Sequence, residues 1–258
     1  MVDNILEVKN IGLSFGGLAA LSDLSFNMKK GEIKGLIGPN GAGKSTMFNI
    51  IAGVLSPMTG TIKLNNHEIH KLPSFQRVNL GLARTFQNLQ IFNNLTVLEN
   101  VMVGCHSRFR SGFLGAMFSS PLQRSEEKKI RAIAYEKLEL LGLAKQAYTI
   151  AENLSFGEAK ILEIARALAS GPDLLLLDEP VAGVPHAEVA HVSDVIRDIN
   201  REGISVLLVE HNMNFVMQLC DDIVVLNYGK KIGEGTAQAM RSDPEVLKAY
   251  LGEDTENA

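Results

Sequence analysis

The amino-acid sequence predicts an α/β fold, with a sheet covered by helices and a helical insertion within it. Two observations predict this fold. Short runs rich in apolar and β-branched residues alternate along the chain with longer segments in which apolar residues recur at helical spacing. The alternation stops between residues 89 and 153, where helical periodicity and charged residues dominate, and then resumes. Because strands that alternate with helices pair in parallel and need helices on both faces, we expect a parallel sheet.

The individual elements follow in chain order. Strands are expected over residues 5–8, 24–28 and 33–37, and a Gly-rich loop leads from the third strand into a helix over residues 45–52, which Gly53 ends. Within the insertion, one face of an amphipathic helix comprises Ile130, Ile133, Ala134, Leu138 and Leu141. A helix over residues 159–169, a strand over 174–177, a helix over 187–200, a strand over 204–209 and a short helix complete the prediction.

Composition excludes several classes of protein. The chain has 258 residues, 46% of them hydrophobic and 21% charged, which is the balance of a globular protein and not of a disordered or collagen-like one. Its formal net charge of -4 gives no overall attraction to nucleic acid. The sequence has no apolar run of the roughly 20 residues that a membrane-spanning helix needs, and two cysteines cannot build a disulfide framework. These features predict a cytosolic protein.

Residues 38–45, Gly-Pro-Asn-Gly-Ala-Gly-Lys-Ser, match the phosphate-loop pattern of Gly, four residues, Gly, Lys and then Ser or Thr. Glycines let backbone N–H groups turn inward around phosphate oxygens, and the helix that follows directs its positive end to the same point. Lys44 supplies positive charge to the β- and γ-phosphates, and the Ser45 hydroxyl can bind Mg²⁺. The expected nucleotide contacts are Gly38, Pro39, Asn40, Gly41, Ala42, Gly43, Lys44, Ser45 and Thr46.

Two adjacent carboxylates, Asp178 and Glu179, follow the apolar strand over residues 174–177. An open α/β sheet presents its chemistry at the carboxyl ends of its strands, and successive side chains of a strand point opposite ways. We therefore assign Asp178 to Mg²⁺ and Glu179 to polarising the attacking water. His211 follows another apolar strand and is expected at the same edge, in contact with the γ-phosphate.

A second phosphate-binding helix end is predicted at Ser155 and Gly157, which directly precede the helix over residues 159–169. A single bound nucleotide does not require two phosphate-binding helix ends from the same chain. Together with Gln87 in residues 84–87, Arg-Thr-Phe-Gln, and with Pro180 after the two carboxylates, these motifs resemble the ATP-binding cassette (ABC) family of transport ATPases. The resemblance spans essentially the whole chain.

The ABC resemblance implies a P-loop NTPase core, with a mixed sheet, flanking helices, an N-terminal antiparallel β part and an inserted helical subdomain. Residues 1–88 and 154–258 are expected to form the nucleotide-binding core of a single ABC domain, and residues 89–153 the inserted subdomain. The implied activity is ATP hydrolysis coupled to transmembrane transport, with ATP and Mg²⁺ as ligands. The implied location is peripheral, on the cytoplasmic face of the plasma membrane.

The resemblance also implies roles for single residues. ATP is held between the phosphate loop of one subunit and the Ser155 and Gly157 segment of another. Phe15 matches the aromatic residue that stacks on adenine, and Gln87 matches the glutamine that contacts Mg²⁺ and water and couples to the membrane subunits. Glu179 matches the general base, and His211 the switch histidine. The implied partners are transmembrane permease subunits and a second ABC ATPase subunit, with a solute-binding protein in the same system and no nucleic acid.

Several features narrow the resemblance to the ATP-binding subunits of branched-chain amino-acid importers. They are residues 81–88, the Gly- and Phe-rich segment between residues 96–100 and Arg124, the Ala182-Gly183 step and the ending at residues 250–253. The cargo stays open among branched-chain amino acids, urea, short amides and other small solutes.

The sequence also departs from the family pattern at two places. Phe156 stands where a second glycine is usual, and Glu158 where glutamine is common. Pro185 and His186 stand where the family commonly has Asp or Asn and then Pro, in a loop that normally crosses the dimer interface. This favours a related chain over an identical one as the partner cassette, and both stay open.

Two other classes of function compete with transport. A soluble ABC clamp on DNA or ribosomes needs a long coiled-coil insertion or two cassettes in one chain, and this sequence has one phosphate loop and no long heptad stretch. A small kinase with a phosphate loop would leave residues 154–158 without a role. Transport is therefore the favoured hypothesis.

Overall fold

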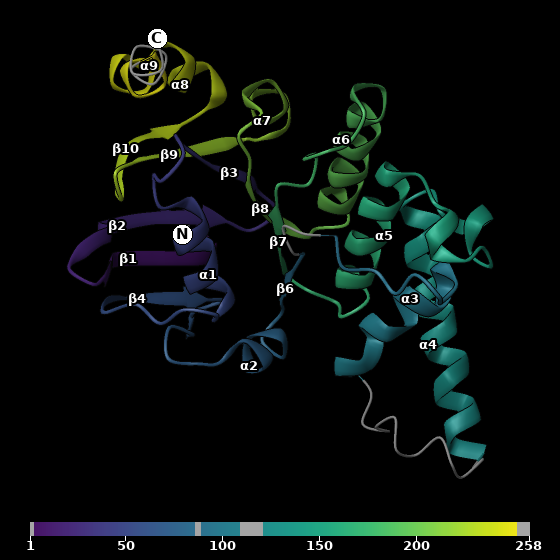
Figure 1. Ribbon diagram of the computed structural model, residues 1–258. Coiled ribbons are helices and arrows are strands. Elements are labelled where there is room, and N and C mark those ends of the chain that lie inside the picture. The colour runs from purple at the N-terminus through teal and green to yellow at the C-terminus, as the bar shows by residue number, and fades with distance from the viewer. Residues whose placement is uncertain (1–2, 86–88, 109–120, 252–258) are drawn as a thin grey trace.

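The computed structural model describes residues 3–85, 89–108 and 121–251, and within them two sheets are stacked beside a group of helices (Figure 1). The larger sheet is six-stranded, in the order β10-β9-β3-β8-β7-β6. Its strands are β10 (Lys230–Gly235), β9 (Asp222–Asn227), β3 (Ile33–Ile37), β8 (Ser205–Val209), β7 (Leu174–Asp178) and β6 (Leu82–Arg84). All neighbours are parallel except β10, which a tight hairpin turns back antiparallel to β9. The predicted α/β class is confirmed, with a mixed sheet.

The smaller sheet is antiparallel and has the order β2-β1-β4-β5. Its strands are β1 (Asn4–Phe15), β2 (Leu18–Lys29), β4 (Thr59–Leu64) and β5 (His67–Glu68). It is the N-terminal antiparallel part that the resemblance implies. The sequence prediction placed much shorter strands in β1 and β2, because irregularities in the β1–β2 pairing interrupt the apolar alternation on which that prediction relied.

The helices divide between the two sides of the larger sheet. They are α1 (Lys44–Ala52), α2 (Ser74–Val78), α3 (Val97–Gly104), α4 (Pro121–Leu140), α5 (Phe156–Leu168), α6 (His186–Arg201), α7 (Met213–Leu219), α8 (Ala237–Ser242) and α9 (Pro244–Leu251), with 3₁₀ turns η1 (Cys105–Arg108), η3 (Ala144–Gln146) and η4 (Ala151–Asn153). Among the described residues between 89 and 153, α3 and α4 pack with α5 and with each other. The division into a core and an inserted subdomain remains a proposal. No helix in the described parts of the chain combines the length and the apolarity that crossing a membrane requires.

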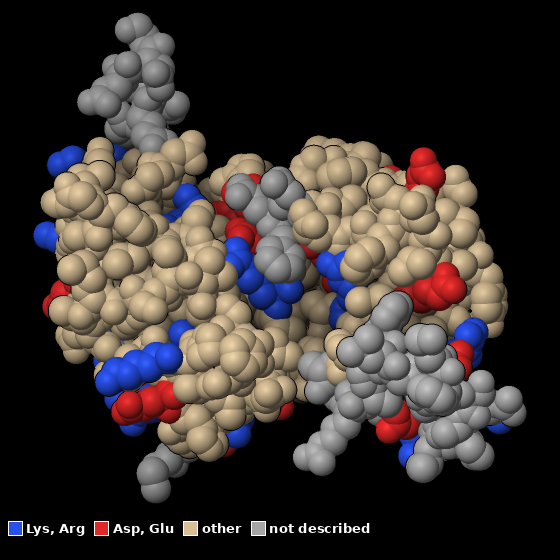
Figure 2. All heavy atoms as spheres, turned by 60° about the horizontal axis from the view of Figure 1, so that its bottom comes forward, with Lys and Arg blue, Asp and Glu red and all other residues tan. Residues whose placement is uncertain are grey.

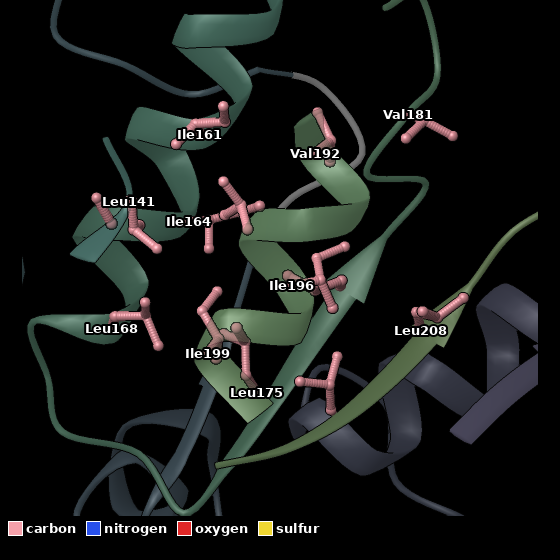
Figure 3. Close-up of a cluster of buried hydrophobic side chains, with 14 of the residues drawn as sticks. Leu141, Ile161, Ile164, Leu168, Leu175, Val181, Val192, Ile196, Ile199 and Leu208 are labelled. Carbon is pink, nitrogen blue, oxygen red and sulfur yellow. The ribbon is translucent and has the colours of Figure 1, made fainter. Parts of the chain in front are cut away.

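Two hydrophobic cores lie on opposite faces of the larger sheet, and β7 contributes to both. Leu175 and Leu177 face the core beneath α5 and α6, whereas Leu174 and Leu176 face the core around α1 and the smaller sheet. Figure 3 shows the first core, in which Ile164 of α5 lies beside α6 and Ile196 of α6 points toward the sheet. Because all side chains of β7 are buried, Asp178, its last residue, and Glu179, which follows it, stand at the end of a rigid element.

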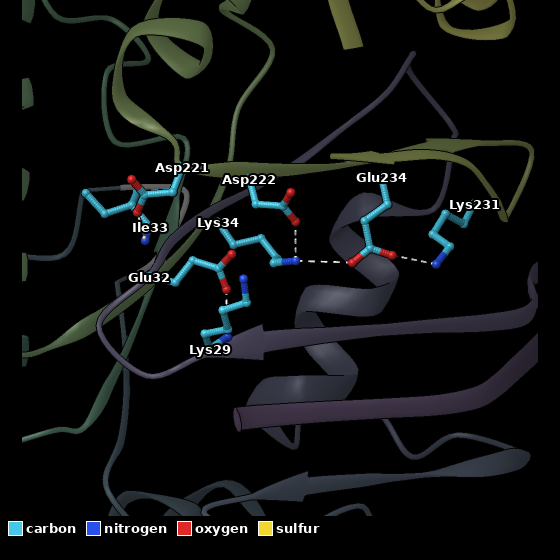
Figure 4. Close-up of polar contacts among 8 residues, drawn as sticks. All are labelled: Lys29, Glu32, Ile33, Lys34, Asp221, Asp222, Lys231 and Glu234. Carbon is cyan, nitrogen blue, oxygen red and sulfur yellow. Dashed lines mark hydrogen bonds and ion pairs between the residues drawn. The ribbon is translucent and has the colours of Figure 1, made fainter. Parts of the chain in front are cut away.

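A buried cation anchors β3, the strand that leads into the phosphate loop. The side chain of Lys34 is 3% exposed and forms ion pairs with Asp222 of β9 and Glu234 of β10, and Glu234 also binds Lys231 (Figure 4). Burial lowers the pKa of Lys34, but its hydrogen bond to Asp222 and the surrounding carboxylates outweigh burial, so the pKa lies above its ordinary value. Lys34 therefore stays charged and ties β3 to both strands on that side.

Candidate nucleotide-binding site

The carboxyl ends of three adjacent strands carry most of the predicted site residues. In the parallel registers of β3, β8 and β7, Val209 lies opposite both Leu36 and Asp178. The phosphate loop follows β3, Glu179 follows β7, and His211 stands two residues beyond the end of β8. The structure therefore brings these predicted groups to one edge of the sheet, as ligand sites of open α/β sheets require.

The phosphate loop, residues 38–45, encloses the ammonium group of Lys44. Lys44 Nζ donates to the carbonyl oxygens of Gly38 at 2.6 Å and Pro39 at 2.8 Å, and the residue is 9% exposed. Gly43 caps the amino end of α1 with a φ of 102°, and no acidic residue stands in the first turn of α1. The helix end is thus a positively polarised anion site with a lysine beside it.

Two glycines of the phosphate loop are required by close approach of other backbone. A Cβ on Gly38, whose φ is 148°, would lie 2.1 Å from the carbonyl oxygen of Leu226. A Cβ on Gly43 would lie 2.8 Å from the carbonyl oxygen of Ala20 on β2. The loop is therefore packed against both β9 and β2, which no side chain larger than hydrogen would permit.

Phe15 ends β1 at the hairpin that joins it to β2, where Gly16 and Gly17 both have positive φ. Its side chain is 51% exposed. Because β2 passes Gly43 at Ala20, this hairpin extends from the same strand that touches the phosphate loop. The position leaves the Phe15 ring available to a flat apolar group such as a nucleotide base.

Asp178, at the end of β7, is buried and held by two residues of the β6 region. Arg84 Nη2 donates to Asp178 Oδ2 at 2.8 Å, and the backbone N–H of Asp178 donates to Thr85 Oγ1 at 3.3 Å. Burial raises the pKa of Asp178, and the hydrogen bond and charge of Arg84 offset this only in part. Sequence reasoning missed Arg84, although it stands directly before Thr85 in the motif that drew attention to Gln87.

Glu179 has a φ of 50°, in the left-handed region that a residue with a side chain rarely adopts. Its backbone N–H donates to the carbonyl oxygen of Val209, which fixes the turn to the end of β8. Glu179 Oε1 lies 3.8 Å from His211 Nδ1, and their side chains are 22% and 63% exposed. The two predicted catalytic groups therefore face each other at the open edge, on a backbone held in a strained conformation.

Glu210 is a buried acidic residue beside the predicted site that sequence reasoning missed. Its Oε1 accepts a hydrogen bond from the Val181 N–H while its Oε2 accepts from the N–H groups of His211 and Asn212. It thus joins the loop after Glu179 to the loop that carries His211. Burial raises the pKa of Glu210, and the three backbone donors offset this only in part. The only sequence signal is a charged residue at the end of an apolar strand.

Arg77 of α2 is a second residue that sequence reasoning missed, and it is 1% exposed. Its Nη1 donates to the carbonyl oxygens of Ile50 and Ile51 at the carboxyl end of α1, and its Nε donates to that of Leu72. Burial lowers the pKa of Arg77 to about 10. The buried cation satisfies carbonyl groups that end α1 and complements the negative end of its dipole.

Ser155 and Gly157 lie away from the phosphate loop, at the amino end of α5. Ser155 caps α5 reciprocally with Glu158: the Glu158 N–H donates to Ser155 Oγ, and the Ser155 N–H donates to Glu158 Oε2. The Phe156 ring packs within 3.1 Å of where a Cβ on Gly183 would lie. In Figure 1 the start of α5 is well separated from α1, so the two predicted phosphate-binding ends are not brought together in one chain.

The predicted Mg²⁺ ligands are Ser45, Asp178 and Gln87, and Gln87 lies outside the described residues. Ser45 is exposed in the first turn of α1, and Asp178 ends β7 at the same sheet edge. A hydroxyl and a carboxylate are the oxygen ligands that Mg²⁺ prefers, so the donor set fits the ion.

A groove of about 580 Å³ lies beside this edge, between β6 and the helices. It is lined by Arg84, Gln90, Ile91, Phe92, Val103, Gly104, Glu163, Arg166 and Ala167. Figure 2 shows basic side chains gathered in the central hollow between the two halves of the surface. Arg166 lies 5.6 Å from the centre of the Phe92 ring, within the range of a cation–π contact.

Comparison with known protein families identifies two matching regions. Residues 21–182 match the ABC transporter family, and residues 230–256 match a branched-chain amino acid ATP-binding cassette transporter family. The chain is 37% identical over 254 residues to the high-affinity branched-chain amino acid transport ATP-binding protein LivG of Escherichia coli K12, covering 98% of this chain and 100% of LivG. It is 38% identical over 250 residues to BraF of Pseudomonas aeruginosa, which carries the same description, covering 96% and 98%.

Solved structures agree with these relatives. The ADP conformation of MJ1267, an ATP-binding cassette of an ABC transporter, is 32% identical in sequence with a TM-score of 0.84, covering 96% of this chain and 99% of that one. A nucleotide-free ATP-binding cassette from an ABC transporter has a TM-score of 0.83 at 32% identity, covering 96% and 98%. The likeness therefore extends over 96% of the chain.

Proposed function

The chain belongs to the ABC transporter family of ATP-binding proteins, and on that premise we propose that it is the ATP-hydrolysing subunit of an importer for branched-chain amino acids. The cargo rests on the relatives, LivG and BraF, and on the match at residues 230–256. Urea, short amides and other small solutes remain the competing cargoes, because the cargo is inferred from the relatives alone.

The observation that carries the mechanism is the separation of the two phosphate-binding helix ends. One is the phosphate loop before α1, and the other is the start of α5 at Ser155 and Gly157. A nucleotide on the phosphate loop cannot reach Ser155 of its own chain. Each nucleotide site is therefore completed by the α5 end of a second cassette, identical or related, and ATP holds the two cassettes together.

Within this site each residue has a definite task. The phosphate loop and Lys44 hold the β- and γ-phosphates, and Phe15 offers its ring to the base. Glu179 accepts the proton of the attacking water, and His211 contacts the γ-phosphate from the neighbouring strand end. Ser45, Asp178 and Gln87 would hold Mg²⁺, which would neutralise negative charge on the phosphates. Hydrolysis and release of phosphate remove the contacts that join the cassettes, and the pair opens.

We propose that membrane subunits receive the movement produced when the two cassettes close and open. The groove lined by Arg84, Phe92 and Arg166 adjoins the residues before Gln87 and the helices of the insertion. A permease segment seated there would receive any movement of α3 and α5 relative to the sheet. The protein would then work on the cytoplasmic face of the membrane, alongside an exported solute-binding protein.

Two measurements test the proposal. The protein is expected to sediment with membranes and to leave them in detergent together with integral subunits. Cells in which Lys44→Ala replaces the natural chain are expected to lose ATP-dependent uptake of leucine, isoleucine and valine. Sedimentation only with ribosomes or DNA would contradict transport. Normal leucine uptake with loss of urea or amide uptake would leave transport standing and overturn the cargo.

A further inference from the structure

Glu188, in the first turn of α6, lies directly against the α5 phosphate-binding end. Its Oε2 is 3.4 Å from Ser155 Oγ, and a Cβ placed on Gly157 would lie 1.9 Å from the same carboxylate oxygen. The carboxylate thus lies at the two residues that are proposed to bind the partner's γ-phosphate. Its backbone is fixed at the start of α6 by a hydrogen bond from the Glu188 N–H to the Pro185 carbonyl.

The neighbouring side chains restrict Ser155 on its other side. Glu158 Oε2 accepts from the Ser155 N–H at 2.8 Å, and Gln146 Nε2 donates to Glu158 Oε1 at 2.9 Å. A cavity of about 340 Å³ lies beside this chain of hydrogen bonds, and its lining includes Ser155, Glu158, Glu188 and His191. The Ser155 hydroxyl accepts from the Glu158 N–H, so its single proton is directed to Glu188.

From these contacts we propose that Glu188 is a positioning residue that sets the ATP concentration at which two cassettes close. This role of Glu188 rests on the proposed function, because it concerns the γ-phosphate that a partner cassette presents to Ser155. To bind that phosphate, the Ser155 hydroxyl must give up its hydrogen bond to the Glu188 carboxylate and donate to a phosphate oxygen instead. The phosphate also brings negative charge to within a few ångström of a carboxylate, which opposes closure. Glu188 therefore fixes the orientation of the Ser155 hydroxyl while the cassettes are open. It also raises the ATP concentration that is needed for the two cassettes to close.

The test compares Glu188→Gln with wild type in the transporter assembled with its membrane subunits. Glutamine keeps the size of the side chain and an oxygen that can accept the Ser155 proton, but it removes the charge. The ATP concentration for half-maximal hydrolysis is expected to fall by at least about fivefold, with little change in kcat, because like-charge repulsion no longer opposes closure. Glu188→Ala, which also frees the Ser155 hydroxyl, is expected to lower it at least as far.

Two controls separate the effect of the Glu188 charge beside Ser155 from a change in overall charge or in the affinity of the phosphate loop for ATP. Glu202→Gln removes the same charge at the other end of α6 and is expected to leave the half-maximal ATP concentration unchanged. Binding of a fluorescent ATP analogue to the dilute, open chain is expected to be the same in all variants, since Glu188 lies away from the phosphate loop. Thermal unfolding establishes that each variant is folded.

The outcomes are distinguishable from failure of the proposed function. If wild type neither assembles with membrane subunits nor hydrolyses ATP, the proposed function fails. If wild type is active and Glu188→Gln leaves the half-maximal ATP concentration unchanged or raises it, the role of Glu188 is overturned. A fall in kcat alone in both Glu188 variants would assign the residue to maintaining the fold of the α5 end and would also overturn the proposal.

Discussion

Arg84 Nη2 lies 2.8 Å from Asp178 Oδ2, and Nη1 of the same guanidinium lies 2.7 Å from Asn49 Oδ1. One side chain therefore joins β6, β7 and α1, and its Cζ lies 5.3 Å from the centre of the Phe48 ring. Because Arg84 immediately precedes the segment that carries Gln87, the proposed Mg²⁺ carboxylate and the start of that segment are fixed to each other.

Arg84→Met is expected to lower the free energy of unfolding by about 3 kcal/mol, because it leaves the buried Asp178 carboxylate without its cation. Urea unfolding measures the loss. Arg201→Met is the matched control: it breaks an ion pair with Asp198 whose side chains are both exposed, and it is expected to cost less than about 1 kcal/mol. Equal losses in the two variants would contradict a structural role for the Arg84 pair.

Lys44→Ala is expected to weaken ATP binding at least about tenfold, because one charge-assisted contact to phosphate contributes about 1.5–3 kcal/mol. Titration with a fluorescent ATP analogue measures the change. Lys71→Ala, which removes an exposed lysine, serves as the control and should bind like wild type. Unchanged affinity in Lys44→Ala would show that the ammonium group serves only to bind the carbonyl oxygens of Gly38 and Pro39.

Glu179→Gln is expected to bind ATP with nearly normal affinity while hydrolysis falls by about a hundredfold or more, because the water loses its proton acceptor. Paired cassettes should then accumulate in the presence of ATP, and light scattering would detect them. Turnover close to that of wild type would remove Glu179 as the general base.

Glu179→Gly separates backbone strain from catalysis. The positive φ of Glu179 disfavours any residue with a Cβ, so glycine is expected to raise the free energy of unfolding by about 0.5–1 kcal/mol. Hydrolysis is nevertheless expected to be lost. Thermal unfolding beside an ATPase assay tests both halves, and a less stable glycine variant would show that the Glu179 side chain, and not its backbone, sets stability there.

Glu210→Gln tests the pH dependence of stability. Since burial raises the pKa of Glu210, the folded state binds more protons than the unfolded state between the ordinary and the raised values. This contribution is fully present below the ordinary pKa and is lost as pH rises through the raised one. The stability of wild type relative to the variant, measured by urea unfolding, should therefore decline as pH rises above the ordinary pKa and through the raised one. A difference that grows with pH would reverse the assigned direction.

Much of the site was predictable because its signals are local. The phosphate loop and the strand end at Asp178 and Glu179 each occupy one short run, and β3 was predicted with its observed bounds. Capping of α5 by Ser155 likewise needs only the next three residues. Contacts within one turn or one strand end can be inferred from a single sequence.

The parts that escaped prediction depend on partners distant in the chain. Arg77 reads as a surface residue of a short polar segment, yet its partners are carbonyl groups 26 and 27 residues earlier. From the sequence Glu210 is expected to be a solvent-exposed residue at the end of a strand. In the structure its side chain accepts a hydrogen bond from the N–H of Val181, in another loop. The β9–β10 hairpin was missed as well, because the polar residues of β10 give it little apolar alternation.

The guanidinium of Arg77, on α2, is hydrogen-bonded to α1, so the two helices are expected to move together as a rigid unit. With a pKa of about 10, it stays charged throughout the physiological range, so the three carbonyl contacts do not loosen with ordinary changes in pH. Phe75, exposed on α2, is therefore attached to α1, the helix that begins at the phosphate loop. A spectroscopic label at Phe75 sits where it can follow the position of the phosphate-binding helix from the outer surface of the protein.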